Sequence, residues 1–242
     1  MAGVMPAAAA KAKPKRKAGP HYRLEKGCGE VVVCGVDEAG RGPWAGPVVA
    51  AAVILNPKKI PKGLDDSKKL TAEKREALEL AIKEKALAWA VGSADVDEIS
   101  TLNILHASGK AMLRAVEQLQ PAPIVALVDG NYRFPLPCEV RTVVGGDALS
   151  VSIAAASILA KVARDRLMIE MDGVFPGYGF ARHKGYGVPE HAKALKALGP
   201  TPIHRMTFPR VQRVLGLGQL SLDFTDEGSE LETDLEFDAL PE

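Results

Sequence analysis

Four acidic residues stand at positions where side-chain carboxylates could bind metal ions. Asp37 and Glu38 directly follow the short apolar run 31–36, and Asp129 directly follows the apolar run 124–128. The fourth acid, Asp147, follows two glycines and precedes an apolar, alanine-rich segment. Carboxylate oxygens are the ligands that Mg²⁺ and Mn²⁺ prefer in proteins. Together, the four acids therefore indicate a site for divalent cations.

Taken singly, these acids also have plain structural interpretations. Asp129 precedes a glycine in a common turn pair, and Asp147 is a typical helix-start residue. The adjacent Asp37 and Glu38 fit such an interpretation less well, because like charges repel close to a core and a divalent cation would relieve that cost. Neighbouring strand residues point to opposite faces, so joint metal binding by Asp37 and Glu38 predicts that the strand ends or bulges there.

Three loops carry groups that suit a nucleic-acid backbone. Gly40-Arg41-Gly42 allows close backbone approach and supplies an arginine for a phosphate, although these residues equally describe a tight turn. A second loop carries Lys68 and Lys69, which matter for such binding only if they lie near the acids. The loop 182–187 places bases beside Tyr186, as for a stacked base, with an ordinary solvated loop as the alternative.

The elements that must position these residues follow from hydrophobic periodicity. Short apolar runs predict strands at 31–36, 48–55, 88–92, 124–128 and 140–144. Helical spacing predicts helices at 71–85, 105–119, 150–171, 190–198 and 211–215. Strands and helices that alternate in this way predict an α/β fold, in which ligands bind beyond the carboxyl ends of the strands. The acids after two of the predicted strands stand at such ends.

Composition limits the class of protein and separates the ends from the middle. Of 242 residues, 47% are apolar and 25% are charged, and there are three cysteines, which excludes a wholly disordered chain and a disulfide scaffold. The apolar runs are too short to span a membrane. A net charge of +1 hides seven bases against one acid in residues 1–27 and nine acids without a base in residues 215–242. We therefore expect a disordered basic arm over 1–27 and a disordered acidic tail over 216–242.

The N-terminus also bears on the location of the protein. Lysines and prolines interrupt residues 1–20, so this stretch lacks the apolar segment of a secretory signal. A transit-like interpretation stays open, because lysines are frequent there and acids are absent. A cytoplasmic protein with a basic arm is the simpler interpretation.

Several motifs in a fixed order resemble those of the type 2 ribonucleases H, specifically bacterial ribonuclease HII. The motifs are Gly35–Pro43, Leu64–Leu70, Val128–Asn131, Gly146-Asp147, Ala155–Val162 and His183–Gly187. They span residues 31 to about 215, which we expect to be the catalytic domain, over 28–215. One mild departure is Thr207 before Phe208, where the family usually has serine.

The resemblance implies an RNase H-like fold with a central mixed β-sheet flanked by helices and a C-terminal helical region. It implies a monomeric endoribonuclease that hydrolyses the RNA strand of RNA–DNA hybrids. Such an enzyme also nicks DNA duplexes 5′ to embedded ribonucleotides and leaves a 3′-hydroxyl, with Mn²⁺ or Mg²⁺ as cofactor. The catalytic residues and metal ligands that it implies are Asp37, Glu38, Asp129 and Asp147. The substrate-binding residues that it implies are Gly40, Arg41, Gly42, Lys68, Lys69, Lys161, Lys184 and Tyr186.

The acidic tail contains a short peptide with a resemblance of its own. Residues 219–224 are similar to the Gln-Leu-x-Leu-x-Phe type peptides with which bacterial replication and repair proteins bind the sliding clamp. The residues that would bind the clamp are Gln219, Leu220, Leu222 and Phe224. Because the motif is short, a tail with a few stray apolar residues is the alternative.

Two other functions stay open at this point. One is a related metal-dependent nuclease, such as ribonuclease HIII or a DNA-directed enzyme. Ribonuclease HIII carries an N-terminal substrate-binding domain, whereas an arm of 27 residues is too short to fold as one. The other is a non-enzymatic nucleic-acid-binding protein, which would bind without turnover and would not need the carboxylates.

Overall fold

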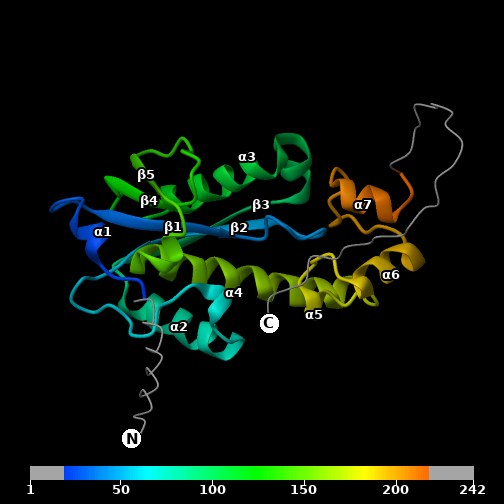
Figure 1. Cartoon of the computed structure of the whole chain (residues 1–242), viewed down its shortest axis with the longest axis horizontal. Helices are drawn as coiled ribbons and strands as arrows, with labels where there is room; N and C mark the ends of the chain where they lie inside the picture. Colours follow the sequence, from blue (N-terminus) through cyan, green and yellow to red (C-terminus); the bar gives the residue numbers. More distant parts are fainter. Residues whose placement is uncertain (1–18, 218–242) are drawn as a thin grey trace, which may run out of the picture.

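The computed structural model describes residues 19–217, which form a mixed sheet with helices on both faces (Figure 1). The sheet has five strands in the order β3-β2-β1-β4-β5 within the described residues. Their bounds are β1 Val33–Ala39, β2 Val48–Ile54, β3 Ala88–Ala94, β4 Val125–Asp129 and β5 Glu139–Val143. β2 runs antiparallel to β1 and β3, whereas β4 runs parallel to β1 and β5. This arrangement confirms the expected central mixed sheet.

The helices divide between the two faces of the sheet. The longer ones are α2 Ala72–Lys85, α3 Val96–Glu117, α4 Val151–Val174 and α6 Pro189–Leu198. The short ones are α1 Arg23–Lys26, α5 Phe180–His183 and α7 Pro209–Val214, with the 3-10 turns η1 Ser67–Lys69 and η2 Gly146–Ala148. α3 packs on one face of the sheet, and α4 with α2 packs on the other. α5, α6 and α7 gather at one end of the molecule and form the expected C-terminal helical region (Figure 1).

The central strand lies unusually close to α4, because of one residue without a side chain. A Cβ at Gly35 of β1 would lie 2.1 Å from the carbonyl carbon of Ser152 and 2.4 Å from the amide nitrogen of Ile153. Side chains in a packed interior need far more room, so only glycine lets the strand approach the first turn of the helix. This contact fixes the distance between α4 and the strand that ends in the acidic pair.

One expectation from the sequence needs correction, and a second is confirmed and extended. β1 does not end or bulge before the acids: it continues through Asp37 and Glu38, which pair in regular register with β2. The helix expected at 105–119 is confirmed as the second segment of α3: Asn103 breaks the helix with φ of +64°, and its side chain caps the next turn by accepting from the Leu105 amide at 2.9 Å. The first segment, which the periodic pattern does not predict, begins at Val96 after a capping box formed by Asp95 and Glu98.

The N-terminal boundary also lies earlier than expected. Residues 23–26 form α1, and its Glu25 is buried, accepting hydrogen bonds from the Ser150 hydroxyl at 2.6 Å and the Ser152 amide at 3.0 Å. This segment therefore packs against the start of α4 and is not part of a disordered arm. Residues 1–18 and 218–242 of the expected arm and tail lie outside the described residues. In the described part of the chain, no helix combines the length and apolar character that crossing a membrane requires.

Candidate active site

Parallel pairing of β1 with β4 brings two of the predicted acids together. Val36 is the register partner of Val128, so Asp37 and Asp129 occupy the next level of the same two strands. Because side chains alternate along a strand, both acids share the face on which Leu127 packs toward α4. Residues 92 positions apart in the sequence thus meet at the carboxyl end of the sheet, where α/β folds bind ligands.

Asp37 is held in a buried and strongly acidic environment. Only 5% of the residue is exposed, and its Oδ1 accepts a hydrogen bond from the Glu38 amide at 2.7 Å. Ser157 of α4 also hydrogen-bonds to this carboxylate. Burial, followed by the charges of Glu38 and Asp129, raises the pKa of Asp37 well above its usual range. A positive charge at this point would relieve both effects.

Glu38 lies on the opposite side of the strand yet belongs to the same electrostatic cluster. Its carboxylate contacts the Arg41 guanidinium at 3.4 Å. Burial raises the pKa of Glu38, Arg41 opposes this rise, and the charge of Asp129 adds to it. Both acids that the sequence pattern selects therefore lie in one cluster of carboxylates, although the strand does not break between them.

Asp147 reaches the site through a turn that is tied to Asp129. The turn η2 follows β5, and the Gly146 amide donates a hydrogen bond to Oδ1 of Asp129 at 2.7 Å. Burial, and then the charges of Asp66 and Asp129, raise the pKa of Asp147. Asp66, whose charge contributes to this rise, is an acid of the site that sequence reasoning left unselected, although it lies in the motif 64–70.

The donor set fits hard divalent cations, although it is not a closed cage. All the acids offer carboxylate oxygens, which Mg²⁺ and Mn²⁺ prefer, and their mutual repulsion favours a cation between them. Across residues 19–217, no three His, Cys, Asp or Glu side chains converge closely enough to enclose a metal ion. Three of the acids contact protein groups: Asp37 accepts from the Glu38 amide, Glu38 contacts Arg41, and Asp129 accepts from the Gly146 amide. Cation binding would therefore require Glu38 to exchange its arginine partner.

The loop that carries Lys68 and Lys69 lies beside the acids. This position is the one that a role of these lysines in nucleic-acid binding requires. Asp66 caps η1 by accepting from the Lys68 amide at 2.9 Å, and Asp66 itself contacts Asp147. The Lys69 ammonium pairs with Asp65 at 3.1 Å, and this hydrogen bond raises the pKa of Lys69. Lys68 and Lys69 thus stand at the border of the acidic cluster.

Tyr186 lies against the loop 40–42, which we call the glycine loop. A Cβ at Gly42 would lie 3.9 Å from the Tyr186 ring, and the Lys161 ammonium is 5.8 Å from the ring centroid. Lys161 also hydrogen-bonds to Asp165 at 2.8 Å. The Tyr186 ring, the exposed residues 41–42 and the Lys161 ammonium therefore lie together next to the carboxylates.

Two buried histidines hold the backbone of Tyr186. The Thr201 amide donates to Nδ1 of His204 at 2.9 Å, so the other ring nitrogen of His204 carries the proton. That nitrogen donates to Nε2 of His191 at 3.0 Å, and Nδ1 of His191 donates to the Tyr186 carbonyl at 2.8 Å. Burial lowers the pKa of His191 to about 3 and that of His204 to about 4, so both rings are neutral at neutral pH.

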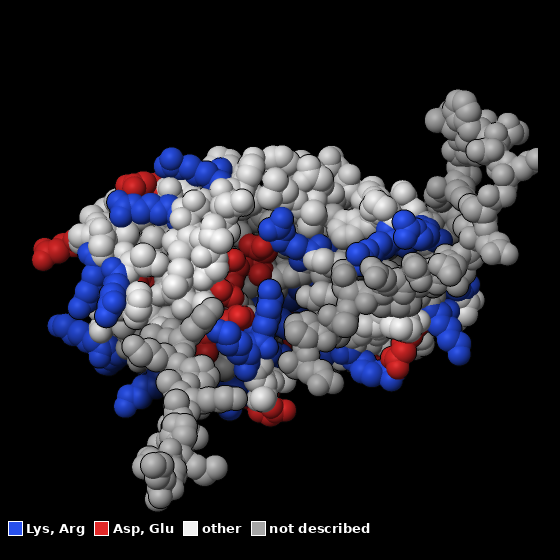
Figure 2. Space-filling view, in the orientation of Figure 1, with Lys and Arg blue, Asp and Glu red and all other residues white. Residues whose placement is uncertain are grey.

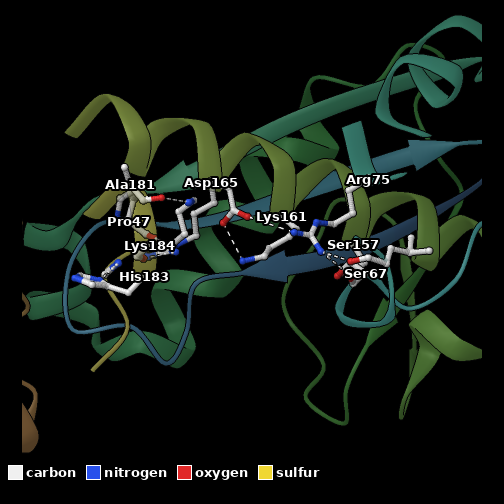
Figure 3. Close-up of polar contacts among 12 residues, drawn as sticks. Pro47, Ser67, Arg75, Ser157, Lys161, Asp165, Ala181, His183 and Lys184 are labelled. Atoms are coloured by element: carbon white, nitrogen blue, oxygen red, sulfur yellow. Dashed lines mark hydrogen bonds and ion pairs between the residues drawn. The ribbon is translucent and has the colours of Figure 1, made fainter. Parts of the chain in front are cut away.

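A row of polar side chains follows α4 away from the acids (Figure 3). Ser157 shares a hydrogen bond of 2.8 Å with Ser67, and Arg75 donates to the Ser67 carbonyl at 3.0 Å. Further along, Lys161 lies next to Asp165, and Lys184 donates to the Ala181 carbonyl. Sequence reasoning missed Ser157 and Arg75; the motif 155–162 contains the first, and no local signal marks the second.

The same face of the molecule displays both signs of charge (Figure 2). Acidic side chains gather in a hollow near its centre, and lysine and arginine side chains border them. A polyanion that crossed this face would meet bases on its phosphates and the carboxylates at one point only. This arrangement suits metal-dependent chemistry on a nucleic-acid strand.

Comparison with known proteins agrees with these features. The family model "Ribonuclease HII" matches residues 34–211. A curated ribonuclease HII from Caulobacter vibrioides (strain NA1000 / CB15N) is 63% identical over 197 residues, which are 81% of this chain and 93% of that protein. The family match covers the five strands from residue 34 on, the four acids and the C-terminal helices as far as residue 211.

Solved structures give the same result. The ribonuclease H2 from Pyrococcus horikoshii OT3 superposes with a TM-score of 0.64 at 28% identity, over 76% of this chain and 97% of that one. A PCNA:RNase HII complex from Archaeoglobus fulgidus gives a TM-score of 0.63 at 27% identity, over 74% of this chain and 95% of that one. Motifs, fold and relatives agree, and the chain belongs to the ribonuclease HII family.

Proposed function

We propose that Asp37, Glu38, Asp129 and Asp147 bind the divalent cations, Mn²⁺ or Mg²⁺, on which this metal-dependent endoribonuclease relies. By family, the enzyme hydrolyses the RNA strand of RNA–DNA hybrids and nicks DNA duplexes 5′ to embedded ribonucleotides. The observation that carries the proposal is the cluster of like charges at the ends of β1 and β4. Burial and the two neighbouring acids raise the pKa of Asp37, and divalent cations would offset that repulsion.

The protein residues divide the remaining work between holding and orienting. When bound, the cations supply water activation and charge stabilisation at the scissile phosphate. Asp129 keeps the Asp147 turn in place through its hydrogen bond with Gly146. Ser157 orients Asp37 from α4. No serine or histidine nucleophile is needed for such a reaction.

Recognition of the ribose is assigned to the loop 40–42 and to Tyr186. The 2′-hydroxyl is the group by which a protein distinguishes RNA from DNA. Arg41 and Gly42 are exposed beside the Tyr186 ring, which can pack against the sugar and base, and the buried Gly40 begins this loop. The side chains proposed to contact the flanking phosphates are Lys68, Lys69, Lys161 and Lys184. Arg75 adds positive charge along the same row.

A cleavage assay tests the proposed function. The substrate is a DNA duplex with one ribonucleotide in one strand, incubated with Mn²⁺ or Mg²⁺ in turn. We expect one nick 5′ to the ribonucleotide that leaves a 3′-hydroxyl, no cleavage of the all-DNA duplex, and loss of turnover with EDTA. Equal cleavage of both duplexes would support a DNA-directed nuclease, and binding without turnover would support the non-enzymatic alternative.

The family assignment also bears on partners outside the active site. The structure of the related archaeal enzyme is a complex with PCNA, a sliding clamp, which supports a clamp contact in this chain too. We assign that contact to the peptide with Gln219, Leu220, Leu222 and Phe224, which lies outside the described residues. Leucine and phenylalanine two positions apart could enter an apolar groove as an extended segment.

Substitution in this peptide should abolish capture by a bacterial sliding clamp and leave hydrolysis unchanged. The variant is Leu222→Ala with Phe224→Ala, and the matched control is Leu231→Ala with Phe237→Ala in the same tail. The measurement is a pull-down on immobilised clamp with the nick assay run in parallel. Equal capture of both variants would assign the contact elsewhere.

The remaining proposals concern organisation and location. The residues proposed as the catalytic domain are 28–215, extended toward the N-terminus by α1, which packs on α4 through Glu25. We place the enzyme in the cytoplasm as a monomer, and gel filtration should then report a mass near 25.7 kDa.

A further inference from the structure

Two arginines beneath the glycine loop are buried without a carboxylate partner. Arg205 is 0% exposed and Arg164 is 1% exposed. In the described part of the chain, neither guanidinium forms an ion pair with an acid, and both donate to backbone carbonyls instead. A buried charge is costly unless its hydrogen bonds are satisfied, so these bonds define what the two side chains do.

Arg205 holds the loop 40–46 at three points. Its Nε donates to the Gly46 carbonyl at 2.9 Å, and its two terminal nitrogens donate to the carbonyls of Arg41 at 2.9 Å and Gly40 at 2.6 Å. The planar guanidinium presents these donors in a fixed fork, which a lysine cannot reproduce. Burial, and then the charge of Arg164, lower the pKa of Arg205 to about 9, so it stays charged at neutral pH.

Arg164 braces the neighbouring part of the same loop. It donates to the carbonyls of Pro47, Ala45 and Lys184, each at 3.0 Å. It also explains the glycine at position 40: a Cβ there would lie 2.1 Å from Nε of Arg164, and the residue has φ of +99°. The buried guanidinium groups of Arg164 and Arg205 therefore hold this loop from its interior side.

The orientation of the carbonyls determines where the amides point. In a trans peptide, the carbonyl of one residue and the N–H of the next point in opposite directions. The peptides after Gly40 and Arg41 are trans, and their carbonyls point at buried Arg205. The N–H groups of Arg41 and Gly42 therefore point away from the interior, and both of these residues are exposed. A cation on the carbonyl also polarises the peptide, which strengthens the N–H as a donor.

The segment that carries Arg205 is itself fastened to the loop. The Arg205 amide donates to the Trp44 carbonyl at 2.8 Å, and the Gly46 amide donates to the Ile203 carbonyl at 2.8 Å. This segment also contains His204, whose ring supports the Tyr186 backbone through His191. The segment between α6 and α7 thus supports both the loop 40–42 and Tyr186, which together form the surface proposed to contact the ribose.

We propose that Arg205 is a positioning residue that aims the amides of Arg41 and Gly42 at the 2′-oxygen of the substrate ribose. The inference rests on the proposed function, because it assumes that the loop 40–42 contacts the ribose. Arg205 itself contacts only backbone and never reaches the substrate. Its role is to set discrimination between ribose and deoxyribose sugars, without a role in cation binding.

The test compares Arg205→Lys with the control Arg114→Lys, which lies on α3 across the sheet. Two DNA duplexes are used, identical except that one nucleotide carries either a 2′-hydroxyl or a 2′-fluorine, which is a poor hydrogen-bond acceptor. We expect Arg205→Lys to lower kcat on the hydroxyl duplex at least about tenfold, the scale of one lost hydrogen bond to a charged group. The preference for hydroxyl over fluorine should fall by the same factor. KM should stay within about twofold, and the control should match the original chain.

Independent readouts separate this proposal from the proposed function. Titration of Mn²⁺ by calorimetry should give the same affinity for Arg205→Lys as for the original chain. Loss of kcat together with loss of Mn²⁺ affinity would overturn the inference, as would a change in KM alone or an unchanged hydroxyl preference. Failure of the proposed function would appear differently, as Mn²⁺ affinity or turnover that Asp129→Asn does not change.

A second variant guards against a protein that does not fold. Arg205→Ala leaves a space into which added guanidinium ion can bind at millimolar concentration. Recovery of the hydroxyl preference with guanidinium, but not with the same concentration of sodium, would support the proposal. Recovery of the thermal transition without recovery of the preference would overturn it, because Arg205 would then serve folding alone.

Discussion

Asp129→Asn should lower kcat on a duplex with one ribonucleotide by about three orders of magnitude, because metal-assisted charge stabilisation supplies several kcal/mol. The substitution removes a charge and leaves the local structure in place. The asparagine Oδ1 can still accept the Gly146 amide, which now lies 2.7 Å from Oδ1 of Asp129. The turn that carries Asp147 should therefore keep its position, and only the affinity for divalent cations should fall.

Three measurements check this expectation. Steady-state kinetics give kcat, calorimetry gives the Mn²⁺ affinity, and fluorescence anisotropy in EDTA gives the affinity for the duplex. The affinity for the duplex should stay within about threefold, because the lysines and arginines of the row along α4 and the loop 40–42 are unchanged. Asp97→Asn, an exposed acid in the first turn of α3, is the matched control. Normal turnover in the Asp129→Asn variant would refute the assignment of this residue as a metal ligand.

Gly35→Ala should lower the free energy of unfolding by about 3 kcal/mol, the upper range for one added methyl in a packed interior. The added Cβ would lie 2.1 Å from the carbonyl carbon of Ser152, and backbone cannot turn aside as a side chain does. Strand β1 and helix α4 must therefore separate. Their separation would also move Asp37 away from Ser157, so kcat should fall along with stability.

Chemical denaturation followed by circular dichroism measures the change in stability. The control is Gly173→Ala, in the last turn of α4, where a new Cβ meets nothing within 4 Å. That variant should gain about 0.5–1 kcal/mol, since alanine restricts the unfolded chain and favours the helix. Equal stability of the two variants would show that the close contact between β1 and α4 is not needed.

Local patterns predicted the strands and most helices well. The apolar runs that become β1 and β4 end in acids, and a parallel sheet aligns such ends, so Asp37 and Asp129 could be selected from the sequence. The continuation of β1 through Glu38 could not, because its pairing with β2 depends on a partner strand. The start of α3 was readable from Asp95 and Glu98, a signal that the periodic pattern alone passes over.

Long-range support of the site was beyond sequence reasoning. Arg205 lies 165 positions after Gly40. No local pattern near either residue predicts that the Arg205 guanidinium donates a hydrogen bond to the Gly40 carbonyl. The same holds for Ser157, which reaches Asp37 only because α4 lies against Gly35. Single residues near the acids were identifiable by motif, whereas the buried hydrogen bonds that position them depend on the folded chain.

The parallel pairing of β1 with β4 has a consequence for how the enzyme becomes active. Strands β2 and β3 and helices α2 and α3 intervene between Asp37 and Asp129, so the meeting of these acids closes a long loop and belongs to the slow, high-contact-order part of folding. The loop 40–46 acquires its shape later still, because Arg205, which holds this loop by hydrogen bonds, lies near the end of the described chain. A nascent or partly folded chain therefore contains the acids but not the assembled active site. We therefore expect full nuclease activity only from the completed fold.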